Sequence, residues 1–146
     1  MGGGDGLARR VIERCEQLPG AELTFPFGPQ PAVYKIGGKM FAVCAGPSEQ
    51  ALPTQLSLKC DPEYASALRR EHAAIRPGYH LNKRHWITVD LAGELPDGLV
   101  EDLVEDSYDL VYGSLPRARR ARLSAEPTIA AATGRTAAGQ TRPAGS

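Results

Sequence analysis

The sequence predicts an α+β domain in which helices pack on an antiparallel sheet. Three observations carry this prediction: apolar residues recur at helical spacing near the beginning and the end, short segments between them alternate apolar and polar residues, and the links between these segments are short enough for hairpins. The expected order of elements is helix, three strands, helix, two strands, helix (α-β-β-β-α-β-β-α). A chain of 146 residues fits one domain and can bury a core without disulfides or a metal.

The first element is a helix over about residues 7–18, because its apolar residues fall three or four positions apart on one stripe. Pro19-Gly20 ends this helix. Residues 24–31 include three prolines, each of which restricts itself and the residue before it. They predict a stiff extended link.

A hairpin and a third strand follow the link. Segments 33–36 and 39–44 are joined by Gly37-Gly38, and glycine supplies the positive φ that a two-residue hairpin turn needs. Segment 55–60 alternates, which places its two leucines and Cys60 toward the core.

The second helix is expected from Asp61 to about His72. Aspartate is a favoured N-cap, and Pro62 suits the first helical position because it lacks the N–H that would be unpaired there. The buried side of this helix is predicted to carry Tyr64, Ala67 and Leu68.

The last strand and helix lie near the end of the folded part. Residues 86–91 alternate, with Trp86 on the face away from the inward residues. The longest helical stripe covers residues 96–112; Gly113 fits the position after its end, and Pro116 keeps it from resuming.

The balanced charge of the chain, 17 basic against 17 acidic residues, is unevenly distributed. Residues 1–116 carry a net charge of −5, whereas residues 117–146 carry six arginines and one acid and a net charge of +5. Beyond residue 122 there is almost nothing large to bury, so ordering this segment would not be repaid by packing. We expect a folded domain over residues 1–116 and a basic, Ala/Thr/Gly-rich disordered tail over residues 117–146.

The composition excludes several classes of protein. No apolar run approaches the roughly 20 residues that a membrane span requires, and the first residues lack the basic and apolar regions of a secretory signal. The three cysteines show no Cys-x-x-Cys spacing. We therefore expect a reduced protein in the cytoplasm, with no membrane partner, no zinc site and no cofactor.

Four stretches together resemble the MmcQ/YjbR family of small bacterial proteins. They are Phe25-Pro-Phe-Gly28, Tyr34-Lys-Ile-Gly-Gly-Lys-Met-Phe41, Pro77-Gly-Tyr-His-Leu-Asn-Lys-Arg-His-Trp86 and Asp106-Ser-Tyr-Asp-Leu-Val111. The resemblance covers about residues 7–116. It implies a CyaY-like two-layer sandwich, related in outline to frataxin, and the double-wing DNA-binding role proposed for the family. It offers no enzymatic activity or catalytic residue.

The candidate nucleic-acid-binding residues are mostly cations at the expected hairpin tips and in the basic segment after residue 116. All three histidines and five cations lie between residues 69 and 85, and Asn82-Lys-Arg84 is expected to cap an extended pair. A partly exposed Trp86 beside this tip could stack on a base while the cations meet phosphates. The residues are Lys35, Lys39, Arg69, Arg70, Asn82, Lys83, Arg84, His85, Trp86, Arg117, Arg119 and Arg120.

Several alternatives stay open at this point. Trp86 could instead pack within the domain, and the cations could be a solvated turn. A second function is a protein- or small-molecule-binding module in which residues 25–31 and Trp86 line an aromatic groove. His80 and His85 lack a third metal ligand at suitable spacing, and no nucleophile–base pair indicates an enzyme.

The last helix is strongly acidic. Six acids lie between residues 97 and 109, and no Lys or Arg lies between residues 85 and 116. These acids predict a hydrated face, since exposed charges are readily solvated. The arginines of residues 117–122 would then either be held loosely beside the acids or extend freely into solvent.

Overall fold

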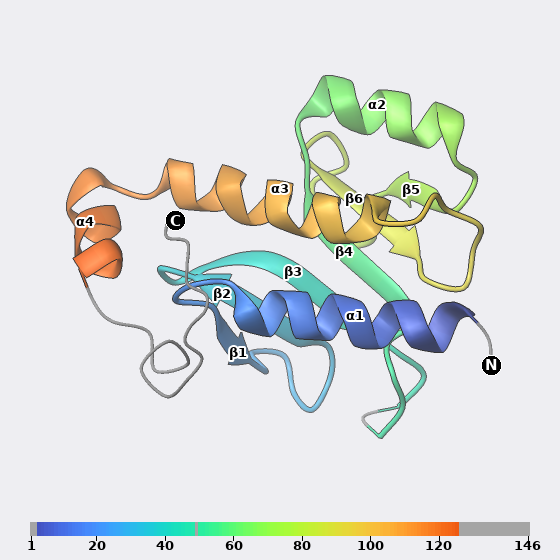
Figure 1. Cartoon of the computed structure of the whole chain (residues 1–146), viewed down its shortest axis with the longest axis horizontal. Coiled ribbons are helices and arrows are strands. Elements are labelled where there is room, and N and C mark those ends of the chain that lie inside the picture. The colour runs from blue at the N-terminus through green and yellow to red at the C-terminus, as the bar shows by residue number, and fades with distance from the viewer. Residues whose placement is uncertain (1–2, 49, 126–146) are drawn as a thin grey trace.

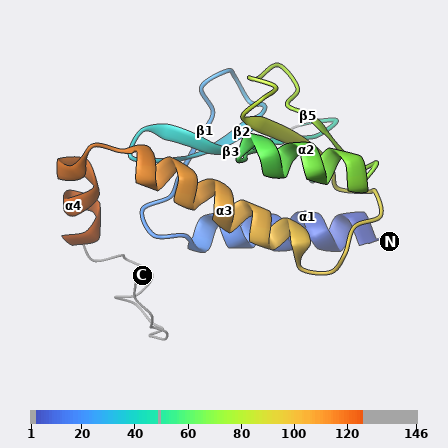
Figure 2. The same ribbon diagram turned by 90° about the horizontal axis from the view of Figure 1, so that it is seen from above.

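Helices α1 and α3 lie side by side over one face of a single sheet (Figures 1 and 2). The coordinates are a computed structural model that describes residues 3–48 and 50–125. The elements are α1 (Gly3–Gln17), β1 (Glu22–Thr24), β2 (Ala32–Ile36), β3 (Lys39–Ala45), β4 (Gln55–Lys59), α2 (Pro62–Glu71), β5 (Ile75–Pro77), β6 (Trp86–Asp90), α3 (Leu99–Ser114) and α4 (Arg117–Ala125). The predicted α+β class and antiparallel sheet are confirmed.

The six strands are ordered β1-β2-β3-β4-β6-β5, and every neighbouring pair is antiparallel. The turn between β2 and β3 is made by Gly37 and Gly38, with φ of 60° and 86°, as the sequence predicts. The β2–β3 register shifts after Tyr34, so that Phe41 has no partner on β2. At this bulge the Phe41 side chain enters the core. Its ring packs edge-on against the Tyr108 ring, with 5.4 Å between the two ring centroids.

The core lies between the sheet and the pair α1 and α3. Helix α1 buries the stripe Ala8, Val11 and Cys15, and α3 buries apolar residues at helical spacing from Val100 to Val111. Burial raises the pKa of the Cys44 thiol to about 12. A thiol with so high a pKa stays protonated at neutral pH, and only the thiolate is a nucleophile, so Cys44 serves as a small core residue.

A single hydroxyl fastens α3 to the sheet. Ser107 is fully buried; its Oγ donates to the Phe41 carbonyl at 2.6 Å and accepts from the Lys59 N–H at 2.9 Å. The β3–β4 ladder ends at the pair Ala42–Leu58, so these two backbone groups lie just beyond it. Ser107 therefore satisfies the polar groups that the end of the ladder leaves free.

Two elements were not predicted. The short strand β1 lies between the first predicted helix and the predicted extended link, which it meets only at Thr24, and α4 lies where the disordered tail was expected to begin. Helix α4 has few apolar residues, but Leu123 packs against the core, and Arg119 bonds to the β2–β3 turn. The described fold therefore continues past residue 116 to residue 125; the rest of the predicted tail lies outside the described residues.

Details of α2 and α3 also differ from prediction. Helix α2 buries Ala65 and Leu68, whereas Tyr64 is exposed. Helix α3 begins at Leu99 after a left-handed Gly98, and it runs through Gly113 to Ser114. The helix continues because the Leu115 side chain, 3% exposed, packs over the Gly37 turn and draws the chain onto the sheet.

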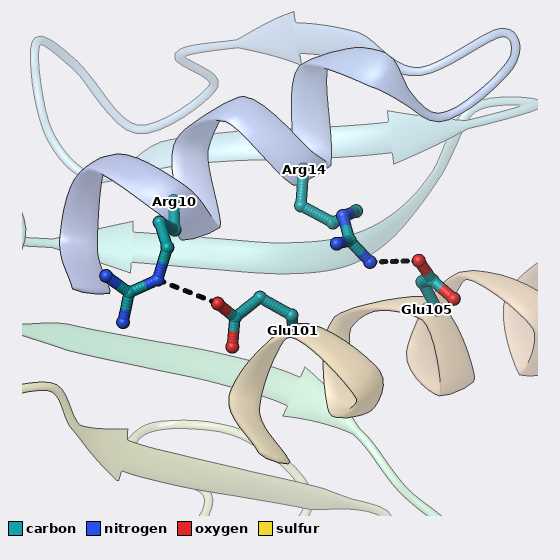
Figure 3. Close-up of polar contacts among 4 residues, drawn as sticks. All are labelled: Arg10, Arg14, Glu101 and Glu105. Carbon is teal, nitrogen blue, oxygen red and sulfur yellow. Dashed lines mark hydrogen bonds and ion pairs between the residues drawn. The ribbon is translucent and has the colours of Figure 1, made fainter. Parts of the chain in front are cut away.

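Two of the acids on α3 are paired with α1 and not with the arginines that follow α3 (Figure 3). Arg10 Nε donates to Glu101 at 2.9 Å, and Arg14 forms an ion pair with Glu105. Burial acts to raise the pKa of Glu101, but the hydrogen bond from Arg10 and the positive charges of Arg10 and Arg14 outweigh it, so its pKa is lowered. Of the two arrangements considered for the arginines of residues 117–122, the loose contact with the acids of α3 does not use Glu101 or Glu105.

Replacing Ser107 with Ala should lower the free energy of unfolding by about 2 kcal/mol, because two buried backbone groups lose their partner. Urea denaturation of the full chain measures this loss. Ser114→Ala is the matched control: its hydroxyl also lies on α3, but at the exposed end, where it donates to the Val111 carbonyl. Equal losses in the two variants would show that Ser107 does not have the special role inferred here.

Replacing Glu101 with Gln should destabilise the protein at neutral pH, and the difference from the wild type should shrink on acidification. A carboxyl whose pKa is lowered by folding contributes stability above its unfolded pKa, and that contribution is lost as the pH falls through the folded pKa. Since Arg10 is half exposed, the expected effect is at most about 1 kcal/mol. Thermal melts between pH 7 and pH 3 test this; a difference independent of pH would contradict it.

Candidate nucleic-acid interface

Two turns leave the sheet at the same end. The register pairs Leu58 with Ala42 on β3 and Lys59 with Trp86 on β6, so the end of β4 adjoins both the beginning of β3 and the beginning of β6. The β2–β3 turn and the β5–β6 loop (78–85) therefore project from the same end. Strands β3 and β6 are two strand spacings apart, roughly 10 Å.

The β5–β6 loop is held by its own side chains. Asn82 Oδ1 accepts from the N–H groups of Arg84 and His85 at 2.9 and 3.1 Å, and Lys83 Nζ donates to the Gly78 carbonyl at 2.8 Å. Asn82 and Lys83, both predicted as contact residues, thus shape the loop from within. Arg84 and His85 are exposed on it.

Trp86 is buried, which agrees with the alternative that it packs within the domain and not with a role in base stacking. It is 9% exposed and packs against Gly78 of the β5–β6 loop; because its neighbours Ile87 and Val89 belong to the core, alternation puts Trp86 on the other face of the sheet. The close packing there is shown by Gly78, where an added Cβ would lie 2.7 Å from the Trp86 Cβ. The loop covers this face because the Tyr79 N–H donates to Thr88 Oγ1 at 2.8 Å.

The exposed aromatic ring of this loop belongs to Tyr79. Its side chain is 58% exposed, and its ring lies 4.0 Å from that of His80. His80 has a positive φ of 58°, which helps the chain to turn at this point. Tyr79 lies within the family motif, but the sequence suggested Trp86 for base stacking, because alternation along β6 puts Trp86 on the face away from the inward residues.

The β2–β3 turn is joined by α4. The Arg119 guanidinium donates to the Gly37 carbonyl, and Leu115 packs so closely that a Cβ on Gly37 would lie 2.6 Å from it. Lys39 is exposed beside them, with Nζ 3.5 Å from Ser114 Oγ. The structure therefore brings together two predicted contact residues, Lys39 and Arg119, and Arg117 is exposed at the start of α4, two residues after Leu115.

The other predicted cations contribute less to this end. Lys35 is half buried and lies opposite Glu22 on β1, and Arg120 is half buried on α4. Arg69 and Arg70 lie in the last turn of α2, which begins beside the end of β4 and extends about 15 Å away from it. Arg70 donates to Ser66 on the same helix at 2.9 Å. Arg70 is therefore held on α2, whereas the Arg69 side chain lies near the end of β4, where its charge acts on the Cys60 thiol.

We call Lys39, Arg84, Arg117 and Arg119, together with Tyr79 and His85, the basic end. The unpaired acids of α3 lie in the helix layer instead; Asp106 and Asp109 line a pocket against α2. Within residues 3–48 and 50–125, no three His, Cys, Asp or Glu side chains lie close enough to hold a metal ion. None of the helices in the same residues is long and apolar enough to cross a membrane.

Comparisons with known proteins agree on one family. The YjbR family model matches residues 16–110. The uncharacterized protein YbdF of Escherichia coli O157:H7 is 39% identical over 73% of this chain and 85% of its own length, and the uncharacterized protein YjbR of Escherichia coli K12 is 36% identical over 75% and 91%. None of these names states an enzymatic activity.

A solved structure has the same architecture. The crystal structure of Deinococcus radiodurans protein DR2400 is 38% identical, covers 80% of this chain and 86% of its own, and superposes with a TM-score of 0.71. The family model and the relatives together confirm the resemblance that the four motifs indicated. The chain belongs to the YjbR family.

Proposed function

We propose that the protein binds nucleic acid, DNA in the first place, through the basic end. The observation that carries this proposal is the shared position of the β2–β3 turn and the β5–β6 loop, with α4 adding arginines to the first turn. Phosphate contacts by Lys and Arg supply most of the affinity of sequence-tolerant binding. The protein acts here as a binding protein and not as an enzyme.

The pre-formed β5–β6 loop supports this proposal. Its internal hydrogen bonds through Asn82 and Lys83 fix the loop before any ligand arrives, so little ordering entropy is lost on binding. Arg84 is left to meet a phosphate, and Tyr79 is left to stack on an unpaired base. Tyr79 thus takes the role that the sequence suggested for Trp86.

The distribution of charge also favours the basic end. The excess of acids in residues 1–116 is an argument against binding to a duplex, since duplex binders usually have a basic surface. Arg10 and Arg14 neutralise two of these acids, and the unpaired acids Asp106 and Asp109 lie between α2 and α3. Among the described residues, Lys39, Arg84 and Arg119 have no acidic partner, so their charges are available to phosphates.

The cytoplasm is our proposed location. Nucleic acid is available there, and Cys15, Cys44 and Cys60 are all free thiols, as a reducing compartment would keep them.

One observation favours the alternative of a protein-binding or small-molecule-binding module. Phe25 and Phe27 are 51% and 68% exposed in the β1–β2 loop, which projects from the same side of the sheet as the β5–β6 loop (Figure 2). The groove predicted between this segment and Trp86 would lack its second wall, because Trp86 is buried. A contact made by Phe25 and Phe27 alone remains the second candidate.

Replacing Lys39, Arg84 and Arg117 with Ala should flatten the salt dependence of DNA binding. Each phosphate contact contributes about 0.9 to the slope of log K against log salt, so the slope should fall by up to about 2.7. Fluorescence anisotropy with a labelled oligonucleotide at several salt concentrations measures it.

The control for this experiment is Arg70→Ala, combined with Arg9→Ala to remove exposed charge away from the basic end. The control should leave the slope nearly unchanged. No binding by the wild type at low salt, or equal slopes for the triple variant and the wild type, would end the proposal.

A further inference from the structure

A pocket of about 320 Å³ opens in the helix layer. It lies between the beginning of α2, the end of β4 and the middle of α3, and none of its lining residues belongs to the basic end. Its lining residues are Lys59, Cys60, Asp61, Tyr64, Leu103, Asp106, Asp109 and Leu110. The volume is that of a small-molecule or single-side-chain site.

The walls of this pocket are fixed by hydrogen bonds. Ser107 holds α3 against β4 at Lys59, and the Cys60 N–H donates to the His85 carbonyl at 2.9 Å. The Asp61 carboxylate caps α2 by accepting from the N–H groups of Glu63 and Tyr64 at 3.1 and 3.2 Å. The Asp61 carboxylate is therefore engaged in capping α2.

The pocket combines apolar surface with two free carboxylates. Leu103 is buried at its base, and Tyr64 and Leu110 are 42% and 41% exposed at its rim. Among the described residues, neither Asp106 nor Asp109 has an ion-pair partner. An apolar wall beside unpaired carboxylates matches the two parts of an organic cation, its apolar stem and its charged group.

The environment of the two carboxylates disfavours their ionised forms. Partial burial, followed by the charges of Asp109, Asp102 and Glu105, raises the pKa of Asp106. Partial burial and Glu105 raise the pKa of Asp109. The other charged groups around the pocket are Lys59 on β4 and Asp61 on α2, together with Arg69 on α2, whose charge acts on Cys60.

We propose that this pocket binds an organic cation with an aliphatic stem, an alkylammonium or alkylguanidinium group. The cation pairs with Asp106 and Asp109, and the stem lies against Tyr64, Leu103 and Leu110. A simple inorganic cation would use the charge alone and leave the apolar surface exposed. A free amine and the side chain of a peptide Arg or Lys offer the same chemistry, and the experiment separates these two sources.

The experiment is a titration of the nucleic-acid-free full chain followed by NMR of the Tyr64, Leu103 and Leu110 side chains. Spermidine represents the free amine, the blocked peptide acetyl-Leu-Arg-Leu-amide represents the side chain, and magnesium chloride represents charge without a stem. At least one organic probe should bind more tightly than magnesium and shift these resonances. Which of the two does so identifies the source.

The variant is Asp106→Asn with Asp109→Asn, which should weaken binding at least about tenfold, the loss expected for charge-assisted hydrogen bonds. Glu105→Gln is the matched control: it neutralises the neighbouring position on the same helix, but its carboxylate pairs with Arg14 on α1. Binding should survive in this control. The double variant should also melt at a higher temperature at neutral pH, because it removes two unfavourably placed charges, and this gain should vanish on acidification.

Three results would overturn the proposal. They are the absence of shifts at the pocket with both organic probes, binding of magnesium as tight as that of the organic cations, and equal loss of binding in Glu105→Gln and the double variant. The last two would mean general attraction to an acidic surface. None of these results depends on whether the basic end binds nucleic acid.

Discussion

The hydroxyl of Ser107 is the contact on which the arrangement of this end of the molecule depends. By donating to Phe41 and accepting from Lys59, it joins α3 to two strands where their own ladder stops. With α3 held there, its C-terminal end reaches the β2–β3 turn, Leu115 covers Gly37, and α4 is brought to that turn. The same contact fixes the wall of the pocket between α2 and α3. One buried serine thus joins the helix layer to the sheet beside the β2–β3 turn and beside the pocket, whereas the β5–β6 loop is held by its own hydrogen bonds.

The basic end and the pocket carry opposite charge. The chain is neutral overall, yet cations lie at the two turns and on α4, whereas Asp106 and Asp109 line the pocket between α2 and α3. Two other acids of α3, Glu101 and Glu105, pair with Arg10 and Arg14 and stabilise the helix layer (Figure 3). Surface charges more than a Debye length apart, about 8 Å at physiological salt, are largely screened from one another, so the neutrality of the whole chain does not prevent local binding of phosphates.

The sequence predicts most of the fold and less of the candidate site. Alternation, the Gly37-Gly38 turn and the Asp61-Pro62 start locate five strands or helices to within a few residues, because each signal is local. Helix α4 was missed because its stability comes from tertiary contacts of Arg119 and Leu123 and not from an apolar stripe. Alternation places Trp86 on the face away from the core but does not decide between exposure and burial; the β5–β6 loop folds back over that face, which no pattern within the strand reveals. For the same reason the roles of Asn82 and Lys83 inside the loop, and the exposure of Tyr79, needed the structure.

Whether the basic end binds nucleic acid is tested most directly by NMR. A short oligonucleotide, single-stranded and then duplex, is added to the protein, and the changes in amide chemical shift are mapped. We predict that the shifts concentrate at the β2–β3 turn, the β5–β6 loop and α4, with the Tyr79 ring responding most to the single strand. Shifts confined to residues 25–31, or to the pocket between α2 and α3, would contradict this prediction and place the binding surface elsewhere.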